Sequence, residues 1–182
     1  MPVTQLDARS ALVLIDLQNG TLGQNLATPA ADLVARALEL AAEFHRRDLP
    51  IAVVTAIGTP PGRTEYSGRV PTSFPAQFSE LPEAIATLAA DIRIAKTSWG
   101  AFVGTQLHDE LSARGITQVV LAGLATSFGI ESSAREAYDL GYSVIIATDA
   151  ISDPNPASHE HSLRQVFPAL AELAITADII AL

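Results

Sequence analysis

The feature that most constrains the fold is an alternation of short apolar runs with longer stretches of helical spacing. The runs are typical of strands buried on both faces, and turn residues bound them. We expect strands at 11–16, 51–55, 92–96, 118–123, 142–147 and 174–181, and helices at 29–47, 81–90, 104–114, 127–140 and 157–173. This alternation predicts an α/β fold, a three-layer, Rossmann-like arrangement in which a six-stranded parallel sheet has helices on both faces.

Composition excludes several classes of protein. The 182 residues suit one domain, so we expect 1–182 to form a single unit. No apolar run reaches the ~20 residues of a membrane span, and no signal-like segment is visible, so we expect a cytoplasmic protein with no membrane partner. A net charge of -9 argues against nucleic acid. The absence of cysteine excludes disulfides, thiolate metal sites and a cysteine nucleophile.

Chemistry-bearing residues stand at the carboxyl ends of the expected strands, where parallel sheets bind ligands. Asp16 ends the first strand after four apolar residues, and either a buried functional carboxylate or a local backbone cap fits this position. Lys96 ends the third strand and either balances a carboxylate or is a solvated lysine. The turn 123–130 joins a strand to a helix, whose first N–H groups bind anions or oxyanions, unless it is an ordinary connection.

Metal ligands and cofactor motifs are not recognisable. His159 and His161 are two residues apart, which puts them about 200° apart on a helix, so we expect a solvated helix start and no metal site. There is no phosphate-binding glycine motif, and we expect no cofactor. The stretch 58–75 is dense in Gly, Pro, Ser and Thr, which is typical of a lid or binding loop.

Three segments in order resemble the isochorismatase-like hydrolase superfamily. They are LIDLQ at 14–18, KTSWGAFVGT at 96–105 and GITQVVLAGLAT at 115–126, which continues into IESSAREAY at 130–138 and TDA at 148–150. The resemblance covers roughly residues 11–153. It implies the same six-stranded parallel sheet, a small-molecule substrate and a homo-oligomer, dimer or larger.

The resemblance also implies the catalytic residues. Cysteine hydrolases of this superfamily use an Asp, a Lys and a Cys, which fall on Asp16, Lys96 and Gly129 of this chain. A non-proline cis peptide upstream of the cysteine position would fall around 124–126 and turn backbone N–H groups toward the substrate. The amidase branch often has an Asp/His/His metal site after the second strand, but 58–75 contains neither residue type.

The missing nucleophile decides between the reactions known in the superfamily. Amidase chemistry needs a thiolate, so we reject it here. True isochorismatases also carry Gly at this position and hydrolyse a vinyl ether, in which an acid protonates the vinyl carbon and water attacks. We therefore predict a hydrolase of a small vinyl-ether-like metabolite that uses Asp16 and Lys96 as catalytic acid–base residues. A non-catalytic binding pseudoenzyme on the same fold and an Asp/Lys lyase or isomerase stay open.

The expected substrate-binding residues come from the same motifs: Gln18, Trp99, Phe102, Ala125, Thr126 and Gly129. Trp99 and Phe102 would line the pocket or an interface, or simply pack in the core. The isochorismatase pattern has an arginine after the lysine to hold substrate carboxylates, where this chain has Thr97. Other sources of positive charge are Arg63, Arg69 and Arg135.

The protonation state of Asp16 is the remaining question. A general acid should be protonated near neutral pH, whereas a nearby Lys96 cation lowers the pKa of a carboxyl group. Three solutions are open: burial of Asp16 prevails, Lys96 is neutral, or Asp16 acts as a base on water.

Overall fold

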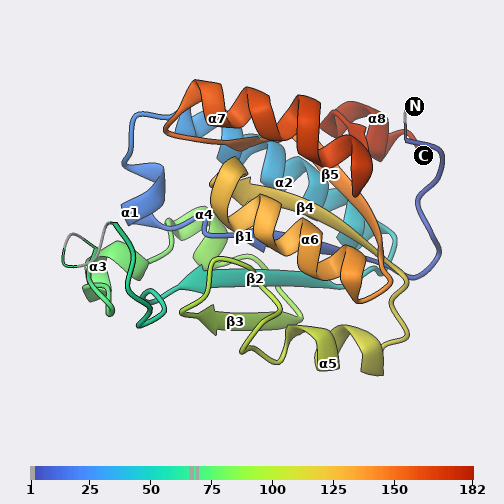
Figure 1. Cartoon of the computed structure of the whole chain (residues 1–182). Coiled ribbons are helices and arrows are strands. Elements are labelled where there is room, and N and C mark those ends of the chain that lie inside the picture. The colour runs from blue at the N-terminus through green and yellow to red at the C-terminus, as the bar shows by residue number, and fades with distance from the viewer. Residues whose placement is uncertain (1–2, 66–67, 69) are drawn as a thin grey trace.

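A six-stranded parallel sheet lies at the centre of the computed structural model, which describes residues 3–65, 68 and 70–182 (Figure 1). The strands of this described part are β1 (Ser10–Ile15), β2 (Ile51–Ala56), β3 (Ile92–Lys96), β4 (Gln118–Leu124), β5 (Ser143–Ser152) and β6 (Glu172–Ala174). Their order is β3-β2-β1-β4-β5-β6, with every pairing parallel. The predicted fold class is confirmed, and the chain order reverses between β1 and β4, which is where such sheets bind ligands.

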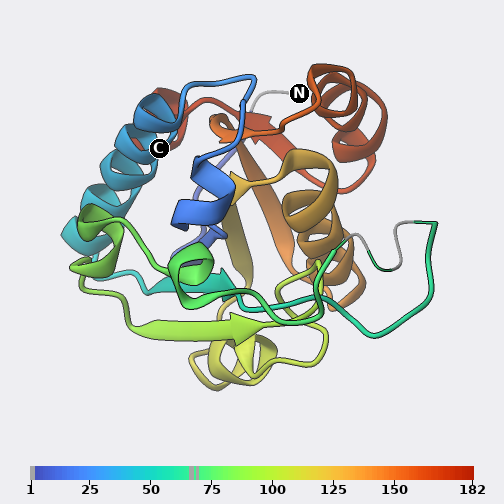
Figure 2. The same ribbon diagram turned by 90° about the vertical axis from the view of Figure 1, so that its left-hand side faces the viewer.

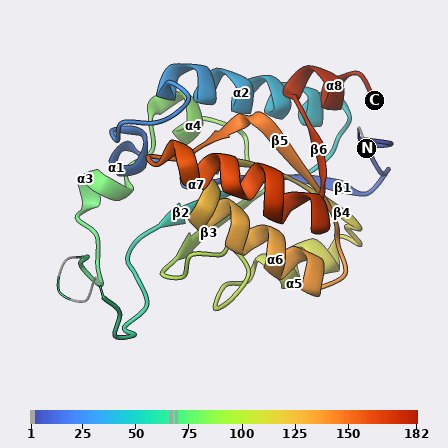
Figure 3. The ribbon, with the colours of Figure 1, turned by 45° about the horizontal axis from the view of Figure 1, so that its top comes forward.

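Helices cover both faces of the sheet (Figures 1 and 3). The α-helices of the described residues are α1 (Asn19–Leu22), α2 (Ala30–Arg46), α3 (Ala76–Ser79), α4 (Glu83–Ala86), α5 (Leu107–Ala113), α6 (Glu131–Asp139), α7 (Pro156–His161) and α8 (Thr176–Ile180). Two π-helical turns, η1 (Thr126–Ile130) and η2 (Ser162–Val166), and the 3-10 turn η3 (Phe167–Ala169) complete the set. No helix of the described residues is long and apolar enough to cross a membrane.

Two cores follow from the alternation of side chains along the strands. In β1, Ala11, Val13 and Ile15 pack in one core with α5, α6 and η3, while the residues between them pack in the other with α2, α4 and α8. The predicted stripe of α2 (Leu33, Ala37, Leu40 and Phe44) is completely buried in this second core. Both faces of the sheet are therefore covered, which leaves the two ends of its strands as the places where a site can form.

The end of the chain differs from the prediction. The run 174–181 was expected to be a strand, but β6 ends at Ala174 and the helix α8 follows. The reason is a cap: Asp149 Oδ1 accepts hydrogen bonds from the Thr176 N–H at 2.7 Å and from its hydroxyl at 2.8 Å. The expected helix 157–173 is likewise divided into α7, η2 and η3, and Pro168 interrupts regular helical bonding there.

Short elements lie across the carboxyl edge of the sheet. Helix α1 follows β1 and packs beside α3, and Figure 2 shows both in front of the strand ends. The expected loop 58–75 begins as an antiparallel pair, with the Phe74 N–H donating to Ile57 O at 2.9 Å and a bridge between Gly58 and Ser73. Its role as a lid stays a prediction, and Arg69, one expected source of positive charge, lies outside the described residues.

Candidate active site

Asp16 stands directly after β1, in a left-handed backbone conformation with φ +54°. Asp adopts this conformation more readily than most residues because its short side chain bonds to local backbone groups. Only 6% of Asp16 is exposed, and its Oδ2 accepts a hydrogen bond from Lys96 Nζ at 2.8 Å. Its Oδ1 has no hydrogen-bond partner in the described part of the chain. A buried carboxylate oxygen without a partner is costly unless a ligand or water donates to it.

Lys96 ends β3 and reaches past the end of β2 to Asp16. It is 3% exposed, and its Nζ donates to Asp16 Oδ2 at 2.8 Å, to Ser98 O at 3.1 Å and to Trp99 O at 2.7 Å. An ammonium group has three N–H bonds and a neutral amine only two. Three acceptors therefore fit the charged form of Lys96.

Burial and the ion pair act on the Asp16 carboxyl group in opposite directions. Removal from water raises the pKa of Asp16 from its ordinary 3.8 to about 6, although the Lys96 charge and hydrogen bond lower it. The direction of this shift favours the first of the three open solutions, in which burial of the carboxyl group prevails over its cation. Asp16 is therefore able to exchange a proton near neutral pH.

Gly129 lies in η1, and its missing side chain faces Asp16. A Cβ at this position would be 3.1 Å from Asp16 Oδ2 and 3.3 Å from Ile15 Cγ2. It would also be 2.5 Å from Leu124 O, which is backbone and has no freedom to move aside without a change in the turn. The structure thus brings together Asp16, Lys96 and Gly129, as the positions of the motifs predicted.

The turn before Gly129 contains the cis peptide that the resemblance implied, between Leu124 and Ala125. Ala125 O accepts from the N–H groups of Phe128 at 3.0 Å and Ile130 at 3.1 Å. No acceptor among the described residues takes the Ala125 N–H. The turn therefore has at least one backbone donor without an acceptor among the described residues, and such a group can stabilise developing negative charge.

Two expected substrate-binding residues have other contacts. Gln18 is completely buried, and its Nε2 donates to Ala56 O at 2.8 Å and Phe78 O at 3.3 Å, while its Oε1 accepts from the Ala56 N–H at 2.8 Å. Both amide hydrogens are used, so Gln18 ties the ends of β1 and β2 together and has no donor left for a substrate. Phe102 is buried in the core against Tyr142, with ring centroids 5.9 Å apart, which is the core packing that the sequence left open for it.

An exposed aromatic pair lies next to the buried charges. Trp99 is 55% exposed and Phe128 46%, and their rings meet edge to face with centroids 4.8 Å apart. The Trp99 carbonyl binds Lys96, and Phe128 directly precedes Gly129. Phe128 was missed by the sequence analysis, although its place in the turn beside Gly129 was a usable signal.

The side chain of Thr126, another expected substrate-binding residue, faces a helix. It is completely buried, and its hydroxyl lies 2.8 Å from Nδ1 of His159 on α7. His159 was expected to be solvated, but it is half-buried, and desolvation lowers its pKa. The contact joins residues 33 positions apart, which no local pattern reveals.

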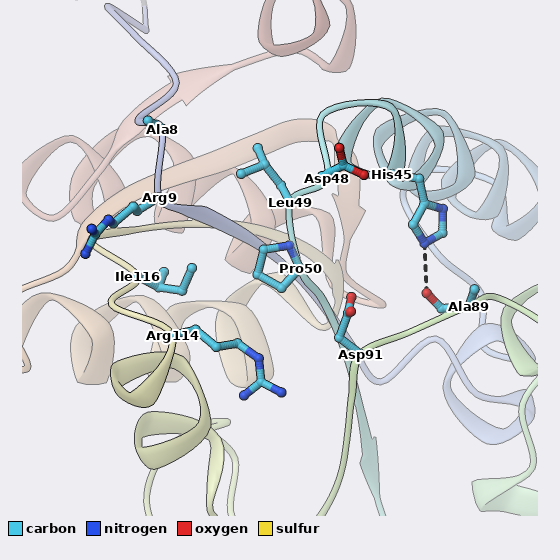
Figure 4. Close-up of a pocket in the computed structure, with 10 residues that line it drawn as sticks. All are labelled: Ala8, Arg9, His45, Asp48, Leu49, Pro50, Ala89, Asp91, Arg114 and Ile116. Atoms are coloured by element: carbon cyan, nitrogen blue, oxygen red, sulfur yellow. Dashed lines mark hydrogen bonds between the residues drawn. The ribbon is translucent and has the colours of Figure 1, made fainter.

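Other charged groups stand apart from this site. Arg135 pairs with Glu131 on its own helix at 3.0 Å. Residues 3–65, 68 and 70–182 hold no group of three potential metal ligands. A cavity of about 590 Å³ lies at the opposite, amino edge of the sheet, where Arg9, His45, Asp48, Asp91 and Arg114 line it (Figure 4).

A family model, curated proteins and solved structures all show similarity of this chain to the same family. The family model "Isochorismatase domain" matches residues 10–178. The uncharacterized isochorismatase family protein YecD of Escherichia coli O157:H7 is 36% identical over 97% of both chains. The structure of an isochorismatase family protein from Burkholderia thailandensis has a TM-score of 0.90 at 36% identity, over 97% of this chain and 96% of that one. An N-carbamoylsarcosine amidase from Thermoplasma acidophilum has a TM-score of 0.76 at 29% identity, over 92% and 96%.

Proposed function

Because the chain belongs to the isochorismatase family of hydrolases, we propose that it hydrolyses a small vinyl-ether-like metabolite without an enzyme nucleophile. Asp16 and Lys96 carry the acid–base chemistry in this proposal. The observation that supports it most is the buried Asp16 carboxyl group, with one oxygen held by Lys96, the other without a partner among the described residues, and a pKa of about 6.

The two oxygens of Asp16 suit two roles. Oδ2 is held by Lys96 at 2.8 Å, so Oδ1 is the atom that transfers a proton. Protonation of the vinyl carbon by Oδ1 leaves an oxocarbenium-like centre and a carboxylate, which the Lys96 ammonium stabilises. Water then adds to the cationic carbon and returns its proton to Asp16, and collapse of the hemiketal releases an alcohol and a ketone.

The site's surroundings fit this scheme. Gly129 places no side chain between the turn and Asp16, and the free Ala125 N–H lies in the same turn. The rings of Trp99 and Phe128 provide an apolar wall beside the charged pair. We therefore propose Trp99, Phe128, Ala125 and Gly129 as the substrate-contacting residues.

Amide hydrolysis by the cysteine route is not part of the proposal. That route needs a thiolate nucleophile, and the sequence contains no cysteine. The likeness to an N-carbamoylsarcosine amidase is therefore a likeness of fold, and it does not supply the nucleophile that this chain lacks.

The test is a substrate panel of isochorismate, chorismate, nicotinamide and N-carbamoyl compounds. We expect release of the keto acid from a vinyl ether, which a coupled assay detects. Hydrolysis of nicotinamide by the wild type would overturn the proposal, whereas ligand binding without turnover would favour the pseudoenzyme.

We also propose that the protein forms a dimer or larger assembly, and light scattering that finds a monomer at all concentrations would refute this.

A further inference from the structure

The segment after β5 holds the turn 125–129 from one side. Asp153 follows β5, is almost completely buried, and accepts hydrogen bonds from the Ser127 N–H and the Ser127 hydroxyl, both at 2.8 Å. Its other oxygen accepts from the Asn155 N–H at 2.8 Å. Asn155 in turn caps α7 by accepting from the N–H of Ala157 at 3.0 Å. Asp153 therefore connects the turn to the beginning of α7.

A second side chain of the same segment holds the neighbouring residue. His159 Nδ1 lies 2.8 Å from the Thr126 hydroxyl, and both groups are removed from most solvent. Figure 3 shows α7 beside α6, the helix into which the turn continues, and the same packing is visible in Figure 1. Two consecutive residues of the turn are therefore held by side chains that come after β5: His159 bonds to Thr126, and Asp153 bonds to Ser127.

This attachment bears on the site because the turn carries three of its features. Ala125 provides the free N–H, Phe128 forms the aromatic pair, and Gly129 faces Asp16. The β4–β5 ladder is irregular between Leu121 and Gly123 and ends with the pair Leu124 and Ser152, so strand pairing stops where the turn begins and the residues of the turn depend on other contacts.

We propose that His159 and Asp153 are positioning residues, which hold the turn 125–129 at the distance from Asp16 that the reaction needs. The effect on turnover rests on the proposed function, but the effect on the turn itself does not. Neither residue touches the substrate in this proposal; both act through Thr126 and Ser127. A displacement of the order of 1 Å in such a turn costs up to about 10²-fold in rate.

The experiment distinguishes the position of the polar group at residue 159 from its mere presence. In His159→Asn the side-chain amide occupies the place of Nδ1, whereas in His159→Gln it extends to the place of Nε2, away from Thr126. Thr126→Ser retains the hydroxyl, and Thr126→Val replaces it with a methyl group of similar size. His161→Gln, two residues away on α7 and exposed, is the matched control. Thermal midpoints of all five variants check that each is folded.

The first measurement needs no substrate. Trp99 is the only tryptophan of the chain and contacts Phe128 of the turn, so quenching of its fluorescence by acrylamide reports on the turn's position. We expect changed quenching in His159→Gln and Thr126→Val, and wild-type quenching in the other three variants. Quenching in His159→Gln and Thr126→Val that equals the His161→Gln value would overturn the proposal.

The second measurement uses any substrate that the panel identifies. We expect His159→Gln and Thr126→Val to lose about 10- to 100-fold in kcat with KM nearly unchanged, because the turn acts on the transition state. His159→Asn and Thr126→Ser should recover most of this loss. An equal loss in the Asn and Gln variants would contradict a positioning role. Absence of turnover in the wild type would reject the proposed function, and the fluorescence result would still decide this inference.

Discussion

The two edges of the sheet treat charged side chains differently. At the carboxyl edge Asp16 and Lys96 are almost completely buried and bonded to each other, with one carboxylate oxygen left over. At the amino edge the charged residues around the cavity of about 590 Å³ remain exposed, and three of them, His45, Asp91 and Arg114, have local partners. Arg114, for example, pairs with Glu110 of its own helix, and Asp91 accepts from the Ile51 N–H at 2.9 Å.

The difference teaches that open volume and reactivity are separate properties. Exposed charges are screened by water and salt, which weakens the effect of each charge on its neighbours. Burial removes this screening, and at Asp16 it raises the pKa to about 6 despite a cation at 2.8 Å. This difference supports our proposal that the reaction takes place at the carboxyl edge, although the cavity of Figure 4 lies at the amino edge.

The largest effect should come from replacing one carboxylate at each edge. Asp16→Asn keeps the side-chain shape but exchanges no proton, so we expect turnover to fall by about 10²–10⁴-fold while the circular dichroism spectrum is retained. Asp91→Asn keeps an acceptor for the Ile51 N–H and should leave turnover unchanged. Vinyl-ether cleavage that survives in Asp16→Asn would sink the assignment of Asp16 as the acid.

The pH dependence of turnover should follow the raised pKa. As a general acid Asp16 is active when protonated, so kcat/KM should fall about tenfold per pH unit above about 6.

The free energy of unfolding should also depend on the proton of Asp16. Between pH 3.8 and about 6 the unfolded chain releases it while the folded chain retains it, so this group makes folding less favourable as pH rises.

Urea unfolding from pH 4 to 8 measures this second effect. The free energy of unfolding of the wild type, relative to Asp16→Asn, should decrease as pH rises and level off above about 6. A free energy of unfolding that stays flat above about pH 5, and that increases with pH only at lower values near 3.8, would mean that Lys96 prevails over burial, so that the pKa of Asp16 is lowered instead.

A smaller effect should come from filling glycine positions. In Gly129→Ala the new methyl group would meet Leu124 O at 2.5 Å, so we expect a loss of about 1–3 kcal/mol in the free energy of unfolding. Gly62→Ala is the control, because a Cβ there has nothing within 4 Å. Equal stability of the two variants in urea would show that the turn yields more easily than its packing suggests.

The smallest effect should come from the amino-edge cavity. Arg9 lines this cavity, is exposed, and forms no ion pair among the described residues, so Arg9→Ala should change the free energy of unfolding by about 0.5 kcal/mol or less. We also expect kcat/KM to stay at the wild-type value. A clear loss of turnover in this variant would contradict the difference that we draw between the two edges, because it would show that the amino-edge cavity takes part in the reaction.

Periodicity and strand ends predicted the parts of the molecule that depend on local pattern. The buried strands and the stripe of α2 follow from spacing alone, and Asp16, Lys96 and Gly129 followed from strand ends together with family motifs. Contacts between residues far apart in the sequence could not be predicted in this way. The apolar run after Ala174 is a helix because Asp149 caps it from 27 positions away.

The same limit applies to side-chain contacts at the site. Gln18 stands beside Asp16 in the motif, but its amide is taken by the backbone of Ala56, 38 positions away. Thr126 stands in the turn, but its hydroxyl is taken by His159. A motif locates residues near a site, whereas side-chain direction depends on partners that the folded chain supplies.

The close packing around Gly129 also limits how this protein can change over evolutionary time. Glycine and cysteine codons can differ by a single base, so a thiol at this position is within easy mutational reach. In the present backbone that thiol's Cβ would collide with Leu124 O, and the turn would have to relax first. A cysteine at this position therefore needs a shift of the turn as well as the base change, so the packing of the turn, rather than the genetic code, separates this chain from a cysteine hydrolase.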